Sequence, residues 1–143
     1  MRGCFGPESS AALGELKVVM DWMCGWQPNV DVVIDEGSRT LVVRAELAGA
    51  DSESLRIYLD DRRLYISGRR AKTARLRGGS FLQKEIADGD FVKSIRLPVA
   101  IAQQEITGSY EDGMLTIALP ISADEYIPAS RMEIRMTVKR VLA

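Results

Sequence analysis

A two-residue period in hydrophobicity constrains the fold of this chain more than any other feature. Between residues 30 and 119, apolar and polar residues alternate in short runs, as they do from Leu41 to Leu47 and from Leu55 to Leu59. A strand places successive side chains on opposite faces, so these runs predict half-buried strands rather than amphipathic helices, whose period is 3.6 residues.

Turn and loop sequences such as "DEGSRT", "LDDRR" and "EDG" separate these runs. Short strands separated by turns of this kind predict an all-β fold, an immunoglobulin-like antiparallel β-sandwich. The strands are expected at residues 30–34, 41–47, 55–59, 64–66, 91–97, 106–110 and 115–119.

The stretch "EDGMLTIALP", residues 111–120, shows how a turn leads into one of these strands. Gly113 suits a turn position with positive φ, which glycine adopts without steric cost. Leu115, Ile117 and Leu119 then point to one face, and Pro120 ends the hydrogen-bonded ladder.

Length and charge limit the classes of partner. The 143 residues suit one domain with modest flanking segments, and 46% apolar with 27% charged residues is an ordinary globular composition. Lys+Arg 19 against Asp+Glu 20 leaves a net charge of -1, which gives no reason to expect nucleic acid as a partner. Glu15, Lys17 and Asp21 interrupt the apolar N-terminal stretch, so we expect neither a membrane span nor a signal peptide.

The chain has no histidine and only two cysteines, Cys4 and Cys24. The absence of histidine rules out Ser-His and Cys-His nucleophiles and the usual general base near neutral pH. The cysteines lie outside any metal-ligand spacing, so we interpret them as reduced thiols of a cytoplasmic protein, with a disulfide as the alternative. We expect no enzyme, no catalytic residues, no cofactor and no metal.

Two flanking segments lie outside the sandwich pattern, which divides the chain into an N-terminal arm (1–27), a β-domain (28–121) and a C-terminal extension (122–143). Helical spacing of apolar residues predicts a short amphipathic helix over residues 9–26. Strict alternation over residues 131–139 predicts a strand that pairs with the edge of a sheet, either in its own domain or in a partner.

A third irregular segment, residues 71–86, is long, basic and interrupted by glycine. We interpret it as an extended arm with one short strand around Phe81 to Lys84. Its basic run lacks interleaved aromatic residues, which favours a solvated arm over a nucleic-acid site. Asp60 and Asp61 are interpreted as a hairpin turn rather than a metal site, because no further ligand is spaced with them.

Flexible methionines and aromatic residues in the N-terminal arm have the character of an adaptable binding surface. The alternative, that they pack against the sandwich or against another subunit, stays open. The candidate binding residues are Phe5, Leu16, Met20, Trp22, Met23 and Trp26.

In their order along the chain, these segments resemble the small heat-shock proteins, a family built on the α-crystallin domain, and in particular its bacterial and plant type. The resemblance covers about residues 27–122 and rests on "WQPNVDVVIDEG", "LVVRAELAGADSESLRIYLDDRRLYISGRR", "GDFVKSIRLP" and "ITGSYEDGMLTIALP". The last stretch holds a Gly-x-Leu signature at Gly113 to Leu115. The resemblance implies an α-crystallin-type sandwich.

The resemblance also implies an ATP-independent holdase, which binds unfolding client proteins and prevents their aggregation. It implies a dimer formed by exchange of the arm, and a larger homo-oligomer in which the tail docks into a groove of a neighbouring chain. The implied residues are Met132 and Ile134 for the tail motif, Leu55, Ile57, Leu59, Ile106 and Tyr110 for the groove, and Phe81, Leu82, Gln83 and Lys84 for the dimer arm. A second hypothesis is a co-chaperone or scaffold module that binds one defined folded partner.

Overall fold

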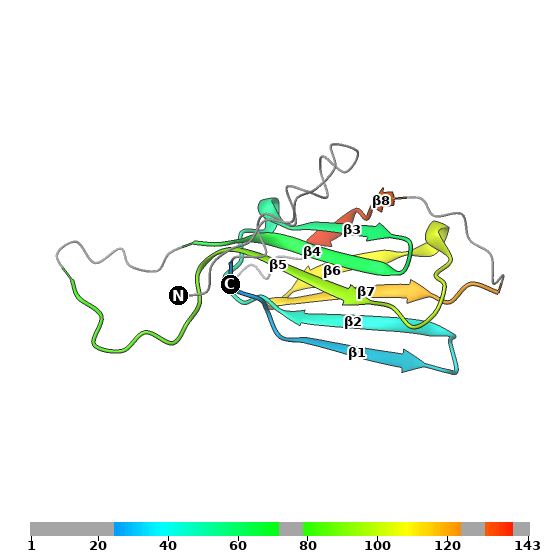
Figure 1. The fold of residues 1–143 in the computed structure, drawn as a ribbon, viewed down its shortest axis with the longest axis horizontal. Helices are drawn as coiled ribbons and strands as arrows, with labels where there is room; N and C mark the ends of the chain where they lie inside the picture. The colour runs from blue at the N-terminus through cyan, green and yellow to red at the C-terminus, as the bar shows by residue number, and fades with distance from the viewer. Residues whose placement is uncertain (1–24, 72–78, 124–130, 139–143) are drawn as a thin grey trace, which may run out of the picture.

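The computed structural model describes residues 25–71, 79–123 and 131–138, and Figure 1 shows two β-sheets packed against each other. The strands are β1 (Val30–Asp35), β2 (Thr40–Glu46), β3 (Arg56–Asp60), β4 (Arg63–Arg70), β5 (Gly89–Arg96), β6 (Thr107–Glu111), β7 (Met114–Pro120), β8 (Arg131–Glu133) and β9 (Met136–Val138). Two short 3-10 helices, η3 (Ser52–Ser54) and η4 (Gln103–Glu105), lie in the connections. The predicted all-β sandwich is confirmed.

One sheet has five strands in the order β1-β2-β7-β6-β9, and the other has four in the order β5-β4-β3-β8. Neighbouring strands are antiparallel, except that β9 runs parallel to β6. The two tail strands, β8 and β9, therefore each end a different sheet on the same side of the sandwich.

The core follows the predicted alternation most closely in the neighbouring strands β2 and β7. Leu41, Val43 and Ala45 on β2 are buried, while the residues between them are half-buried or exposed. The fully buried side chains from both sheets form one cluster: Leu41, Val43, Leu47, Ile57, Leu59, Leu64, Ile66, Phe91, Leu97, Leu115, Ile117 and Leu119.

Strand β1 departs from the prediction of a half-buried strand. Val32 and Ile34 lie in register with the core residues Val43 and Leu41, yet they are 43% and 50% exposed. The two sheets hold unequal numbers of strands, five and four. If β9 lies opposite β8, then β2 lies opposite β5, and the four-stranded sheet has no strand left to face β1. The strand therefore presents apolar side chains to the surroundings.

The turn before β7 has the predicted geometry. Gly113 has a φ of +77°, and its carbonyl accepts a hydrogen bond of 2.7 Å from the N–H of Leu47. A Cβ added to Gly113 would lie 2.9 Å from the Cα of Ala48, closer than such atoms approach in proteins. The glycine is thus required both by its φ and by a backbone that passes next to it.

Gly113→Ala is expected to lower the free energy of unfolding by about 3 kcal/mol, because strain at positive φ is added to a clash with backbone atoms. Gly89→Ala is the matched control, since Gly89 has a φ of +89° but nothing within 4 Å of an added Cβ. That control should cost only about 1 kcal/mol. Urea unfolding of the two variants measures the difference, and equal costs would contradict the close approach at Gly113.

Candidate functional site

The tail closes one side of the sandwich by extending both sheets at once. In the four-stranded sheet β8 pairs with β3, with Leu59 opposite Met132, and in the five-stranded sheet β9 pairs with β6, with Gly108 opposite Met136. Without the tail, β3 and β6 would both be free edges, whose unpaired N–H and C=O groups attract another strand. In this structure residues 131–138 occupy both edges, which flank the groove.

Ile134 lies between the two tail strands and enters the groove. It is 5% exposed, and its N–H donates a 2.9 Å hydrogen bond to the carbonyl of Ile57. Burial of such a side chain stabilises the contact by about 1.5–3 kcal/mol. An ion pair of 3.7 Å between Arg56 and Glu133 is half exposed on both sides, so it adds at most about 1 kcal/mol.

The predicted groove residues belong to the same core cluster as Ile134. Leu55, Ile57 and Leu59 are buried, Ile106 is half-buried, and Tyr110 is 9% exposed. The Tyr110 hydroxyl donates a hydrogen bond to the carbonyl of Leu47, and burial raises the pKa of Tyr110 above its ordinary value.

Two contributions to the groove were absent from the predicted set. Gly108 faces the tail, because an added Cβ would be in ordinary contact with the Ile57 side chain at 3.4 Å and with Met136 at 3.8 Å. Met136 to Val138 extend the docked segment as β9. A glycine inside a strand pattern indicates a close backbone approach, so Gly108 is the signal that the sequence offered.

The source of the docked tail differs from the sequence-based expectation. The expectation was a neighbouring chain, whereas in the structure the tail of the same chain occupies the groove. A single chain offers the groove only its own tail, and the same contacts are available to any copy that presents residues 131–138.

The candidate dimer arm, residues 79–88, carries exposed apolar side chains. Phe81, Leu82 and Ile86 are 57%, 101% and 68% exposed, and Figure 1 shows the arm extending away from the sandwich. Lys84 folds back on the arm itself, with its Nζ 5.5 Å from the Phe81 ring centroid and 3.2 Å from a carboxylate oxygen of Asp88. Lys84 is thus held by contacts within the arm.

The predicted strand around Phe81 to Lys84 is not formed in the single chain, and this prediction is wrong for it. A strand is stabilised by pairing its backbone groups with an edge. Among the described residues, no strand pairs with this segment.

A model of the Hsp20/alpha crystallin family matches residues 33–137, which include most of the sandwich and the docked tail. The chain belongs to this family. The match places the described strands and the tail groove of this Hsp20 chain within one known domain type.

Two curated relatives show the extent of the similarity. The small heat shock protein C4 of Rickettsia felis is 28% identical over 93 residues, which are 65% of this chain and 56% of the relative. The 18.1 kDa class I heat shock protein of Arabidopsis thaliana is 29% identical over 119 residues, 82% of this chain and 71% of the relative. The aligned part of this Hsp20 chain thus spans 56% to 71% of these relatives' length.

Solved structures share the fold. The crystal structure of a small heat-shock protein from Xylella fastidiosa is similar with a TM-score of 0.59 at 27% identity, covering 74% of this chain and 94% of that one. The α-crystallin type of the sandwich is thereby confirmed.

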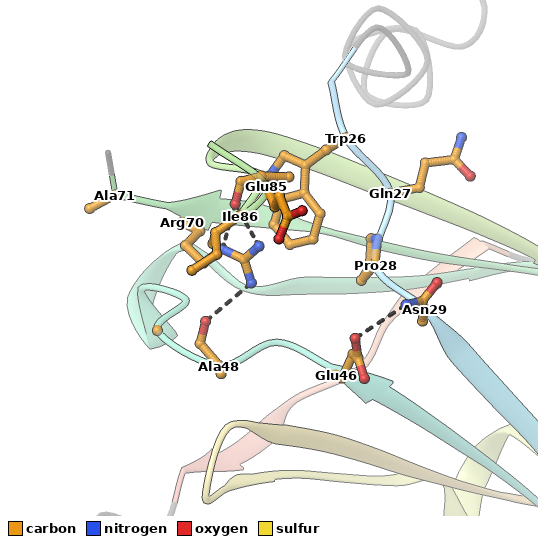
Figure 2. A pocket seen from close by; sticks show the side chains of 12 residues that line it. Trp26, Gln27, Pro28, Asn29, Glu46, Ala48, Arg70, Ala71, Glu85 and Ile86 are labelled. Atoms are coloured by element: carbon orange, nitrogen blue, oxygen red, sulfur yellow. Dashed lines mark hydrogen bonds between the residues drawn. The ribbon is translucent and has the colours of Figure 1, made fainter. Parts of the chain in front are cut away.

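Arg70 connects three segments of this Hsp20 chain at the base of the arm (Figure 2). Its Nε donates a 2.8 Å hydrogen bond to the carbonyl of Ala87 in the arm, and its Nη1 donates one of 3.2 Å to the carbonyl of Ala48. Its guanidinium carbon lies 4.0 Å from the ring centroid of Trp26, a cation–π geometry. These residues line a hollow of about 710 Å³.

Trp26 packs against the sandwich. Its ring centroid is 4.9 Å from that of Phe91, its Nε1 donates a 3.1 Å hydrogen bond to the carbonyl of Gly89, and its backbone forms a parallel bridge with Phe91. The predicted helix over residues 9–26 is wrong at Trp26, which is extended, and residues 9–24 of that prediction lie outside the described residues. The other candidate binding residues, Phe5, Leu16, Met20, Trp22 and Met23, lie outside the described residues.

Within residues 25–71, 79–123 and 131–138, no three acidic or thiol side chains gather as metal ligands would. No helix in these ranges has the length and apolar character to cross a membrane.

Proposed function

We propose that this chain is an ATP-independent holdase that binds unfolding proteins and prevents their aggregation. The observation that carries the proposal is membership of the Hsp20/alpha crystallin family over residues 33–137. Relatives that carry heat-shock names in a bacterium and a plant support it. The adaptor hypothesis has no comparable support.

Holdase action needs apolar surface rather than a catalytic site. A client that exposes apolar surface gains roughly 25 cal/mol for each Å² that it buries on a binding segment. We assign client binding to Phe5, Leu16, Met20, Trp22 and Met23. Trp26 has the geometry of an anchor that fixes this segment to the sandwich, so we remove it from the binding surface. No step of this mechanism uses a nucleophile, a cofactor or a metal.

We propose a dimer formed by exchange of the arm, with β1 of the partner as the acceptor. The arm exposes Phe81 and Leu82, and β1 exposes Val32 and Ile34 beside an unpaired edge. A strand added to this edge would satisfy its backbone groups and cover both sets of apolar side chains.

We further propose that tails dock between chains in a larger homo-oligomer. The small heat-shock protein from Xylella fastidiosa has a distinct high order structure. Here the tail contact uses only residues 131–138 against the edges of β3 and β6, so it requires no particular connection to the rest of its own chain. The division into an arm (1–27), a β-domain (28–121) and an extension (122–143) stays part of this proposal, as does a cytoplasmic location with reduced Cys4 and Cys24.

The test of the proposed function is whether the chain suppresses aggregation of a heat-unfolding client with no nucleotide present. Suppression supports the holdase, and adding ATP should leave it unchanged. A folded chain that does not suppress aggregation at all would contradict the proposal.

A further inference from the structure

The centre of the outer face of the four-stranded sheet is buried, although a two-layer sandwich would leave it exposed to water. On β4 the side chain of Ile66 and the Cα of Gly68 face the core, since an added Cβ on Gly68 would meet Leu55 and Phe91 at 2.8 Å. Alternation then places Tyr65 and Ser67 on the outer face.

These outward residues are nevertheless covered. Tyr65 is 7% exposed, Ser67 is 1% exposed, and Val92, beside Ser67 on β5, is 2% exposed. Tyr65 and Val92 form a small apolar cluster with Tyr58 as its half-buried neighbour. We call Tyr58, Tyr65, Ser67 and Val92 the outer patch.

The outer patch includes a buried hydroxyl group. The Ser67 hydroxyl is buried and has no hydrogen-bond partner, although a hydroxyl on an outer sheet face ordinarily bonds to solvent. The cover is confined to the patch, because Arg69 and Asp90, one step further along β4 and β5, have side chains 67% and 54% exposed.

The described elements do not account for this cover. The inner side of the four-stranded sheet faces the other sheet, and the main contacts of β4 and β5 are with each other, with β3 and with η3. This burial is a property of one chain, so the candidates for the cover are its segments outside the described residues: 1–24, 72–78, 124–130 and 139–143.

The position of Trp26 identifies the candidate. Trp26 forms its parallel bridge with Phe91 at the free edge of β5, one residue before Val92 of the outer patch. The described chain begins at Gly25, directly before this point. A helix over residues 9–24 would be about 24 Å long, and crossing β5, β4 and β3 takes only about 10 Å.

We propose that the N-terminal segment, residues 1–24, docks on the outer patch of its own chain. The apolar residues Leu13, Leu16, Met20 and Met23 recur at helical spacing, so they would form the face that meets the patch. Methionine side chains pack favourably against aromatic rings such as those of Tyr58 and Tyr65. The segment to which we assign client binding would then be stored against the sandwich.

Photo-crosslinking in the full-length chain tests the docking. The tyrosine analogue p-benzoylphenylalanine at position 65 should crosslink to residues 1–24, and mixing heavy- and light-isotope chains should show that the link forms within one chain. The same probe at position 42, half-buried on an outward-facing site of the other sheet, is the control and should not reach residues 1–24. Links to another segment, or links only between chains, would overturn the proposal.

Hydrogen exchange provides an independent measurement. Val92→Asp places a charge in the outer patch and should speed exchange in peptides from residues 1–24 about tenfold, while peptides from β2 and β7 keep their protection. Val42→Asp makes the same change on the other outer face and should leave residues 1–24 unaffected. Equal exchange of residues 1–24 in the wild type and the Val92 variant would contradict the docking. Neither measurement uses a client, so a failed docking test and a failed holdase test are distinguishable.

Discussion

Replacing Phe81 and Leu82 with serine is expected to separate the proposed dimer into folded monomers. Both side chains are exposed in the single chain and would be buried against β1 of the partner. Losing this burial removes about 3–6 kcal/mol for each arm, and a symmetric dimer has two arms. The dissociation constant should therefore rise by at least about 10,000-fold, which sedimentation velocity would detect.

Gln83→Ser is the matched control for the arm, because Gln83 lies in the same exposed segment but carries no apolar side chain. It should leave the mass unchanged. The fold of the double variant should survive, since the arm forms no strand with its own sandwich. An unchanged mass for the Phe81 and Leu82 variant would show that the arm does not hold the dimer together.

Replacing Met132 and Ile134 with alanine is expected to reduce the assembly to dimers. Ile134 is 5% exposed in the groove, and truncation of a buried isoleucine costs about 2–5 kcal/mol. Each subunit would lose this contact, so the larger assembly should dissociate while the arm exchange persists. Light scattering coupled to size-exclusion chromatography measures the mass.

The tail variant also decides whose tail fills the groove. Arg135→Ala serves as its control, because Arg135 lies within the docked segment but is exposed. If the contact is made between chains, the mass falls for the double variant and not for the control. An unchanged mass with a lower unfolding temperature would assign the contact to the chain's own tail and reject the inter-chain role.

The sequence pattern predicted burial best for strands in the interior of a sheet. In β2 and β7 the alternation translates directly into burial, because each strand is flanked by other strands and faced by the opposite sheet. The same alternation was misleading at β1, where Val32 and Ile34 have the pattern of core residues but no facing strand. Burial there depends on how many strands each sheet holds, which no short stretch of sequence encodes.

Contacts between distant segments were the least predictable part of the site. Arg70 looked like one member of a basic run, yet it joins Ala48, Ala87 and Trp26, which are far apart in the sequence. The burial of the outer patch was equally hard to predict, since Tyr65 and Ser67 lie on the outer face of β4, where alternation predicts exposed residues. The groove residues came from the family resemblance, whereas the position of Gly108 beside Met136 of the tail is visible only in the structure.

The most direct test of the central claim is light scattering from a client protein that unfolds on heating, with and without this chain at comparable subunit concentration and without ATP. An unrelated folded protein at the same concentration controls for crowding. The holdase account predicts that scattering is suppressed by this chain and not by the control protein. Unchanged scattering, from a chain shown by circular dichroism to be folded at that temperature, would contradict the account and favour a module that binds one defined folded partner.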